Sequence, residues 1–381
     1  MNSTEIKKKL TRRYMKFYSA FHPIRKKVLF DSFGGRQYSD NPRAVSEKLH
    51  ELYPDYQITW LLSADDQYNL VPDYVSTVRP GVALYNEMAT SCCFVTNSGI
   101  TSGINKRKNQ FFVQTWHGDR PLKKILYAIE NNPEKVDIVD RKVTDLCIAG
   151  STAGVEQFRE AFLYQGEVLC VGTPRNDKLV TCDANLQNML KQRLGLDAQC
   201  KVLLYAPTFR DNNRLDAKVM VNLKETIAEL EQQGEKWVCL IRTHLGSSTM
   251  QYAYDESKFL DVTSYPDMTD LLCITDILIT DYSSCAGDLV VRNKMVILAV
   301  FDIDEYKSNC RDLVYDIDEI GFFVAHDQEE LNSILRNRND TDIENSCRKV
   351  KEFFGIKESG KASEEICKRI NDYYSRITVR R

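Results

Sequence analysis

The feature that most constrains the fold of this chain is a regular alternation of short apolar runs with longer stretches of helical periodicity. The apolar runs are rich in branched and aromatic side chains, which is typical of parallel strands covered on both faces. Such alternation indicates β-α-β units and predicts mainly parallel sheets. The runs predicted to be strands are residues 27–32, 57–62, 75–78, 92–96, 111–116, 146–149, 168–171, 201–206, 237–242, 260–263, 277–279, 295–300 and 321–325.

A polar stretch with weak strand character divides these runs into two series, and 381 residues suffice for two domains with full cores. The chain is therefore predicted to be an α/β protein with two doubly wound parallel-sheet domains of similar size. The expected divisions are an N-terminal helix (1–26), an N-terminal domain (27–172), a linker region (173–199) and a C-terminal domain with closing helices (200–381).

The first 27 residues are basic, with Glu5 as the single acidic residue, and their apolar residues recur at three- and four-residue steps. One interpretation is a helix lying on an anionic membrane surface, where each basic residue adds about 1 kcal/mol. The alternative is a helix packed on the domain with a solvated basic face. No apolar run reaches the roughly 18 residues of a spanning helix, and no secretory signal is visible, so a cytoplasmic location is expected.

Several functional classes find no support in the sequence. The net charge of −3 does not indicate a nucleic-acid partner, and the twelve scattered cysteines form no C-x-x-C pair, which favours buried thiols over zinc or disulfides. The motifs of dehydrogenases, P-loop NTPases, serine hydrolases and zincins are missing. Asp276 and Asp281 are potential metal ligands, but strand-end packing is the favoured role of Asp276, and no metal site is predicted.

Polar and cationic residues follow several predicted strands, where open parallel sheets bind their ligands. Ser283 and Ser284 join the strand 277–279 to a helical pattern, a junction suited to phosphate, although an N-cap role is the alternative. Arginine binds phosphate through its planar donor fork, and a histidine can donate to a phosphate oxygen or protonate a leaving group. The cationic candidates at other strand ends are Arg175, Arg210, Arg242 and His244.

His117 follows the strand 111–116 and has Gly118 and Asp119 beside it. A histidine at a strand end is a candidate general base. The alternative is a structural histidine that caps the following helix.

With these stretches in view, the chain resembles the CDP-glycerol glycerophosphotransferase family, the teichoic-acid primases and polymerases of Gram-positive bacteria and related capsule enzymes. The resemblance spans roughly residues 28 to 320. Its motifs are Ser39-Asp40-Asn41-Pro42, Gln114-Thr115-Trp116-His117-Gly118, Gly172-Thr173-Pro174-Arg175-Asn176-Asp177, Tyr205-Ala206-Pro207-Thr208-Phe209-Arg210-Asp211, Arg242-Thr243-His244 and Asp276 to Ser284. The resemblance implies a GT-B fold, in which two Rossmann-like domains face a cleft.

By this resemblance, the C-terminal domain binds a CDP-alditol and the N-terminal domain accepts a polyprenyl-diphosphate-linked saccharide or polymer. His117 and His244 correspond to the family's essential histidines. The other residues predicted to bind the donor are Thr208, Arg210, Asp211, Arg242, Ser283, Ser284, Arg175 and Asn176, and those on the acceptor side are Trp116, Gly118, Asp119 and Asn41. The resemblance implies no cofactor and a peripheral location on the inner face of the cell membrane.

The implied reaction moves glycerol phosphate from CDP-glycerol to an acceptor hydroxyl and releases CMP. Thr243, Asp312 and Ala286-Gly287-Asp288 depart from the family's pattern, so CDP-ribitol stays open as the donor. A GT-B nucleotide-sugar glycosyltransferase and a non-catalytic scaffold are the remaining alternatives. The sequence indicates neither the number of units added nor the oligomeric state.

Overall fold

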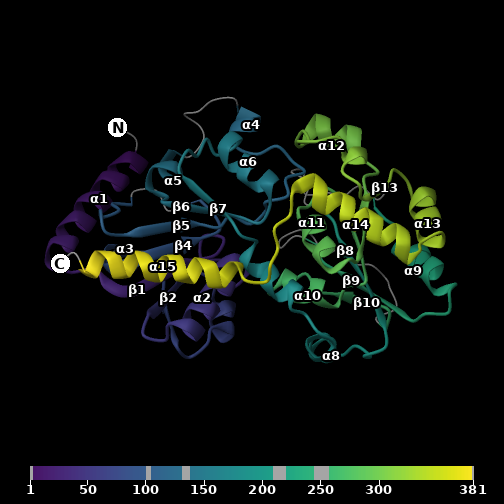
Figure 1. Ribbon diagram of the computed structural model, residues 1–381, viewed down its shortest axis with the longest axis horizontal. Coiled ribbons are helices and arrows are strands. Elements are labelled where there is room, and N and C mark those ends of the chain that lie inside the picture. Colours follow the sequence, from purple (N-terminus) through teal and green to yellow (C-terminus); the bar gives the residue numbers. More distant parts are fainter. Residues whose placement is uncertain (1–2, 100–103, 131–137, 209–219, 244–256, 380–381) are drawn as a thin grey trace. The chain divides into compact units, whose positions relative to one another are not determined.

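A computed structural model describes residues 3–99, 104–130, 138–208, 220–243 and 257–379 of the chain (Figure 1). Contacts divide the chain into two compact units. Unit 1 comprises residues 1–119, 130–177 and 357–381, and unit 2 comprises residues 120–129 and 178–356. Each unit is built on one sheet in which every strand pairing is parallel, which confirms the predicted α/β fold class.

The sheet of unit 1 has seven strands in the order β3-β2-β1-β4-β5-β6-β7. Its strands are β1 (Arg25–Asp31), β2 (Gln57–Leu61), β3 (Val75–Val78), β4 (Ser91–Thr96), β5 (Phe111–Gln114), β6 (Leu146–Ala149) and β7 (Glu167–Cys170). Its helices are α1 (Ser3–Phe21), α2 (Asp40–Leu52), η1 (Asp65–Leu70), α3 (Val82–Thr90), α5 (Ile138–Val143), α6 (Thr152–Glu160), η2 (Pro174–Asn176) and α15 (Ala362–Val379). Two short helices, α4 (Tyr127–Glu130) and α7 (Asp177–Val180), contain two of the four points at which the chain changes unit.

Helices cover both faces of this sheet because successive strand side chains point to opposite sides. Val28 and Phe30 of β1 belong to the apolar cluster that includes residues of α2 and α15. Leu29, the residue between them, belongs to a second cluster that contains Met15 of α1 and Met88 of α3. The continuous apolar pattern of β1 therefore reflects burial on both faces.

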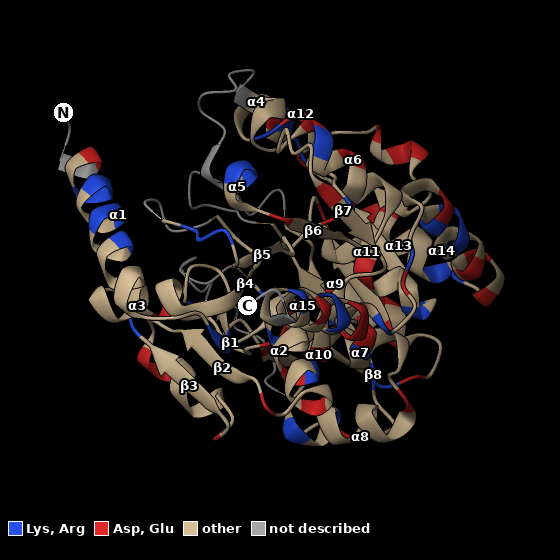
Figure 2. Cartoon of the chain, turned by 60° about the vertical axis from the view of Figure 1, so that its left-hand side comes forward, with Lys and Arg blue, Asp and Glu red and all other residues tan. Residues whose placement is uncertain are grey.

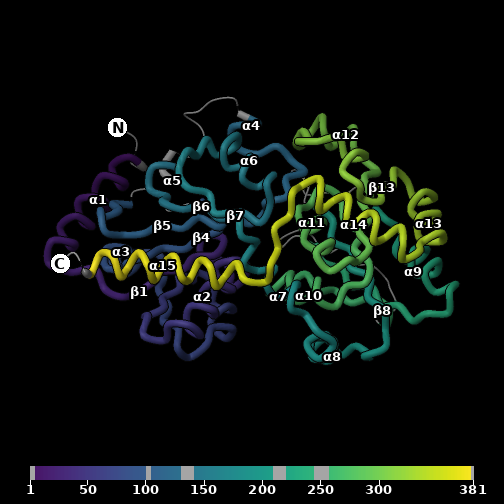
Figure 3. Tube along the Cα trace, in the orientation of Figure 1, coloured from purple at the N-terminus to yellow at the C-terminus, as the bar shows by residue number. Residues whose placement is uncertain are grey.

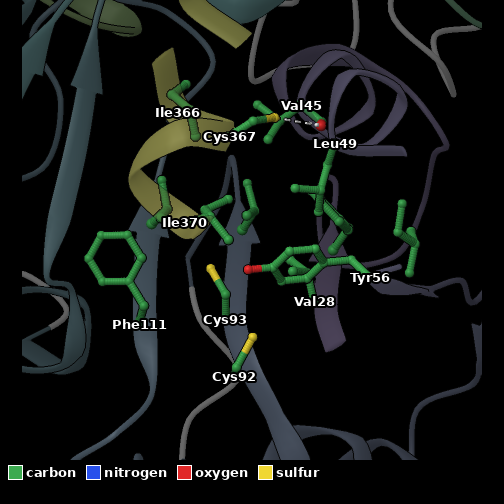
Figure 4. Packing of buried hydrophobic residues seen from close by; sticks show 14 of the residues in the cluster. Val28, Val45, Leu49, Tyr56, Cys92, Cys93, Phe111, Ile366, Cys367 and Ile370 are labelled. Carbon is green, nitrogen blue, oxygen red and sulfur yellow. Dashed lines mark hydrogen bonds between the residues drawn. The ribbon is translucent and has the colours of Figure 1, made fainter. Parts of the chain in front are cut away.

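The C-terminal helix α15 completes the core of unit 1. Ile366, Cys367 and Ile370 are fully buried beside Val45 and Leu49 of α2 (Figure 4). In the Cα trace of Figure 3, the yellow C-terminal helix α15 runs alongside α2. The sequence-based division placed residues 357–381 in the second domain, whereas their contacts place them in unit 1. An amphipathic pattern specifies an apolar face but not the sheet that this face covers.

The sheet of unit 2 has six strands in the order β10-β9-β8-β11-β12-β13. Its strands are β8 (Lys201–Ala206), β9 (Trp237–Ile241), β10 (Phe259–Asp261), β11 (Ile277–Thr280), β12 (Met295–Ala299) and β13 (Phe323–Ala325). Its helices are α8 (Ala184–Arg193), α9 (Leu223–Glu231), α10 (Met268–Ile274), α11 (Cys285–Leu289), η3 (Val290–Arg292), α12 (Ile303–Asn309), η4 (Ile317–Glu319), α13 (Gln328–Arg336) and α14 (Asp340–Phe354). The predicted linker region, 173–199, contains η2, α7 and α8 and is shared between the units.

A buried ion pair lies in unit 2 at α11. Arg120 donates to Asp288 over 2.8 Å, and the two side chains are 1% and 4% exposed. Gly287 packs closely against the methylene groups of Arg120. A Cβ at this position would lie only 2.8 Å from Arg120 Cγ. This contact explains the glycine in the Ala286-Gly287-Asp288 segment.

All twelve cysteines are free thiols in this structure. Most are buried, and burial raises the pKa of several. It raises the pKa of Cys285 to about 11, and it raises those of Cys93, Cys367 and Cys239 further. Thiols held in this protonated form behave as small apolar side chains.

Candidate functional site

The first candidate site lies at the carboxyl ends of β1, β4 and β5, which are neighbours in the sheet of unit 1. The register pairs Asp31 with Thr96 and Thr96 with Gln114, so the three strands end at the same level. Strands β1 and β4 lie on either side of the position where the strand order reverses, the usual ligand site of an open α/β sheet. His117 follows β5 and therefore lies at this edge.

The ring of His117 is held in one orientation. Its Nδ1 lies 2.6 Å from the backbone carbonyl oxygen of Asn97. A carbonyl oxygen can only accept a hydrogen bond, so Nδ1 carries the proton and the lone pair of the neutral ring is on Nε2. The ring centroids of Phe33 and Trp116 lie 5.2 and 4.1 Å away. This is the tautomer that a base acting through Nε2 requires.

The predicted acceptor-side residues gather around the same loop. Asn41 is 1% exposed, donates to the Trp116 carbonyl oxygen over 2.8 Å and accepts from the Arg175 backbone N–H over 3.1 Å. Asp119 is 5% exposed and accepts from the Gly150 backbone N–H. Gly118 is half-buried between His117 and Asp119. Buried Asn41 and Asp119 thus tie the His117 loop to neighbouring strand ends.

Two residues predicted to bind the donor, Arg175 and Asn176, lie in unit 1. Arg175 is 9% exposed and forms an ion pair with Asp40 at 3.5 Å. Asn176 is fully buried and donates to Glu358 over 3.0 Å. Within unit 1, the structure thus brings both residues together with the acceptor-side Asn41.

Sequence reasoning missed two polar residues of this edge, Asp31 and Asn97. Burial raises the pKa of Asp31 to about 6, although hydrogen bonds from the Gly35 backbone and Thr96 oppose this effect. Asn97 is fully buried and follows β4 directly. Both residues stand at the ends of predicted strands, so a search for every polar residue at such ends would have found them.

The second candidate site lies at the carboxyl ends of β9, β8 and β11 in unit 2. Tyr205 pairs with Ile241, and Ala206 pairs with Thr280, so these strands also end together. The predicted donor residues of unit 2 that the structure describes follow these strands. They are Thr208 after β8, Arg242 after β9, and Ser283 and Ser284 after β11.

Asp281 joins two of these strand ends. It is 3% exposed and accepts from the backbone N–H groups of Thr208 and Tyr282, over 2.8 and 2.6 Å. The Ser283 hydroxyl accepts from the Cys285 backbone N–H at 3.5 Å, whereas the side chain of Ser284, the N-cap residue of α11, makes no capping bond. This arrangement gives Asp281 a structural role.

Arg242 places a cation at the second site. Its guanidinium donates to the Tyr265 carbonyl oxygen over 2.7 Å. Burial lowers the pKa of Arg242, while Asp267 and Cys285 oppose the shift, which places the group near the start of α11. The guanidinium keeps its charge because an arginine pKa starts above 12. The edge therefore offers a positive charge and the serine hydroxyls to an anion.

Three predicted site residues, Arg210, Asp211 and His244, lie outside the described residues. Their roles stay predictions. Among the residues that the structure describes, no group of three or more His, Cys, Asp or Glu side chains is arranged to hold a metal ion. Within the same ranges, every helix is too short or too polar to cross a bilayer.

Comparison with known proteins gives a consistent match. Residues 14–372 match the family described as CDP-Glycerol:Poly(glycerophosphate) glycerophosphotransferase. The teichoic acid glycerol-phosphate transferase of Staphylococcus aureus is 30% identical over 91% of this chain and 93% of that protein. The teichoic acid poly(glycerol phosphate) polymerase of Staphylococcus epidermidis is 32% identical over 75% of this chain, which spans only 42% of that longer protein.

A solved structure of the wall teichoic acid polymerase TagF, a histidine variant soaked with CDPG, superimposes on this chain with a TM-score of 0.83. The match has 26% sequence identity and covers 99% of this chain and 100% of the other.

Proposed function

Because this chain belongs to the CDP-glycerol:poly(glycerophosphate) glycerophosphotransferase family, we propose that it transfers glycerol phosphate from CDP-glycerol to a hydroxyl of a lipid-linked teichoic-acid-type acceptor. The observation that carries this proposal is His117, whose Nδ1–H donates to the Asn97 carbonyl oxygen and whose basic nitrogen is therefore Nε2. A general base of this kind is what activation of an acceptor hydroxyl requires.

In the proposed reaction, Nε2 of His117 takes the proton of the acceptor hydroxyl as its oxygen attacks the β-phosphorus of CDP-glycerol. A new oxygen–phosphorus bond forms, the bond from the β-phosphorus to the bridging oxygen breaks, and CMP leaves with that oxygen. Arg242, Ser283 and Ser284, together with the predicted Arg210 and His244, stabilise the charge on the pyrophosphate. Preorganised donors of this type each contribute on the order of 100-fold or more to a rate.

A donor screen tests this function. CDP-glycerol, CDP-ribitol and UDP-glucose are each incubated with the protein and a short polyprenyl-diphosphate-linked acceptor, and nucleotide release is measured. We expect CMP release from CDP-glycerol to exceed release from CDP-ribitol by about 10-fold or more, since pockets discriminate such small differences by roughly 10–200-fold. Reactions without acceptor control for hydrolysis. Faster release from CDP-ribitol or from UDP-glucose would replace the proposed donor.

We further propose that α1 holds the protein on the anionic inner surface of the membrane that carries the acceptor. One edge of α1 packs against the rest of unit 1. There Met15 is fully buried, and Tyr14 donates to Asn86 over 2.7 Å. Phe17 and Phe21 are 68% and 71% exposed, and Leu10 is also exposed. Lysine and arginine residues recur along the helix (Figure 2). Exposed aromatic residues on a basic helix favour an interfacial location.

Vesicle sedimentation tests this role of α1. Phe17→Ser with Phe21→Ser removes exposed apolar surface without touching Met15, and we expect about a 10-fold or larger loss of binding to phosphatidylglycerol-containing vesicles. Met189→Ser removes an apolar residue of unit 2 that is 42% exposed and serves as the control. Unchanged sedimentation of the double variant would reject the membrane role.

A further inference from the structure

Asn97 connects three strand-end loops of unit 1. Its side-chain NH₂ donates to Ser32 Oγ over 3.2 Å and to Asp40 Oδ1 over 3.1 Å. Its side-chain oxygen accepts from the Phe33 backbone N–H over 2.8 Å, and its backbone oxygen accepts from His117. The residue is fully buried. One carboxamide thus joins the loops that follow β1 and β4 to the start of α2.

The orientation of this carboxamide follows from its neighbours. The Phe33 N–H can only donate, so the side-chain oxygen must face it. The Asp40 carboxylate can only accept, so the NH₂ group must face that side. Flipping the amide would place a donor against a donor and an acceptor against a carboxylate. Asn97 is therefore fixed in one position by its partners.

The loops that Asn97 connects contain unusual backbone. Phe33, Asp40 and Trp116 all have positive φ angles, of 51°, 62° and 51°. Non-glycine residues rarely adopt this left-handed region, and they keep it only where the surroundings enforce it. The Phe33 N–H and the Asp40 carboxylate are direct partners of Asn97, and Trp116 precedes the histidine bonded to it. The strained backbone and the hydrogen bonds of Asn97 thus both surround the loop that holds His117.

We propose that Asn97 is a positioning residue that fixes the tautomer and the ring orientation of His117. Its side chain sets where its own carbonyl oxygen lies, and that oxygen keeps the proton of His117 on Nδ1. The consequence for turnover rests on the function proposed above. The consequence for the tautomer does not.

The test is a ¹⁵N NMR measurement of the His117 tautomer at a pH where the ring is neutral, combined with steady-state kinetics. In the wild type we expect the proton on Nδ1. Asn97→Ala keeps the backbone carbonyl but removes all three side-chain bonds, so we expect a substantial Nε2–H population. We also expect kcat to fall about 10–100-fold, which is part of the rate enhancement that a positioned base contributes. KM should change little.

Gln110→Ala is the matched control. Gln110 is also a buried carboxamide of unit 1 with two donated bonds and one accepted bond, to Met88, Ser91 and Arg107. It precedes β5, whereas His117 follows that strand. We expect Gln110→Ala to leave the tautomer and kcat unchanged.

Two results would overturn the inference. One is an Nε2–H tautomer in the wild type, a measurement that needs no variant to fold. The other is an Asn97→Ala protein whose His117 tautomer matches the wild type or the Gln110→Ala control. A shifted tautomer with unchanged turnover would support the positioning role and would reject His117 as the base, so the two proposals fail separately.

Discussion

His117→Asn is expected to lower the rate of CMP release by about 10²–10⁴-fold, the range that a positioned general base contributes. The asparagine side chain can still donate toward the Asn97 carbonyl oxygen, which now accepts from His117 Nδ1 over 2.6 Å. It has no basic nitrogen at the position of Nε2. The variant therefore removes the proton acceptor with little disturbance of the loop. Nucleotide release under single-turnover conditions measures the effect directly.

His50→Asn provides the control for this substitution. His50 also lies in unit 1 and stacks on Tyr74 with a centroid distance of 3.6 Å, away from the end of β5. We expect its turnover to stay within about 2-fold of the wild type, because His50 has no role in the proposed proton transfer. Calorimetry should show that the His117 variant still binds CDP-glycerol. Turnover within about 3-fold of the wild type in His117→Asn would exclude the histidine as the base.

Arg120→Ala is expected to destabilise unit 2 by about 3–5 kcal/mol, because it leaves the Asp288 carboxylate buried without its cation. The substitution also removes the methylene groups that pack against Gly287. Hydrogen exchange at the amides of β8, β11 and β12 measures the free energy of opening in this unit alone. We expect exchange in these strands to accelerate strongly.

Arg348→Ala is the corresponding exposed control. Arg348 pairs with Glu352 on α14, and both side chains are more than half exposed. Such surface pairs contribute about 0.3–0.5 kcal/mol. The double variant Arg120→Met with Asp288→Leu should recover much of the lost stability, since apolar pairs often replace buried ion pairs without cost. Equal exchange rates in Arg120→Ala and Arg348→Ala would contradict the proposed stabilising role of the buried Arg120–Asp288 ion pair.

The strands were predictable because each one has an apolar core that ends in polar residues. Periodicity located β8, β9 and β11, and the parallel arrangement then placed Thr208, Arg242 and Ser283 at one edge. The resemblance to the glycerophosphotransferase family was likewise present in the sequence and is confirmed by the family match. Local pattern and parallel topology thus predicted the fold class and the strand ends that carry the candidate sites.

Long-range contacts were not predictable in this way. No local pattern shows that α15 returns to the sheet of unit 1, or that Arg175 faces Asp40. The role of Asn97 depends on four partners, which come from the loops after β1 and β5 and from the start of α2. The tautomer of His117 depends on one hydrogen bond, which only the folded chain defines.

The fully buried cysteines are protected from thiol reagents in the native chain, whereas the half-buried Cys182, whose pKa a hydrogen bond with Cys273 lowers to about 7, is open to them. Only a thiolate attacks such reagents, and burial suppresses this form at Cys93 and Cys367 in unit 1 and at Cys239 and Cys285 in unit 2. Alkylation at these positions requires a transient opening that exposes the sulfur. The rate at each cysteine therefore reports how often its own unit opens. Peptide mapping of the alkylation at each of these cysteines over time would therefore measure the opening kinetics of both units in a single unlabelled sample.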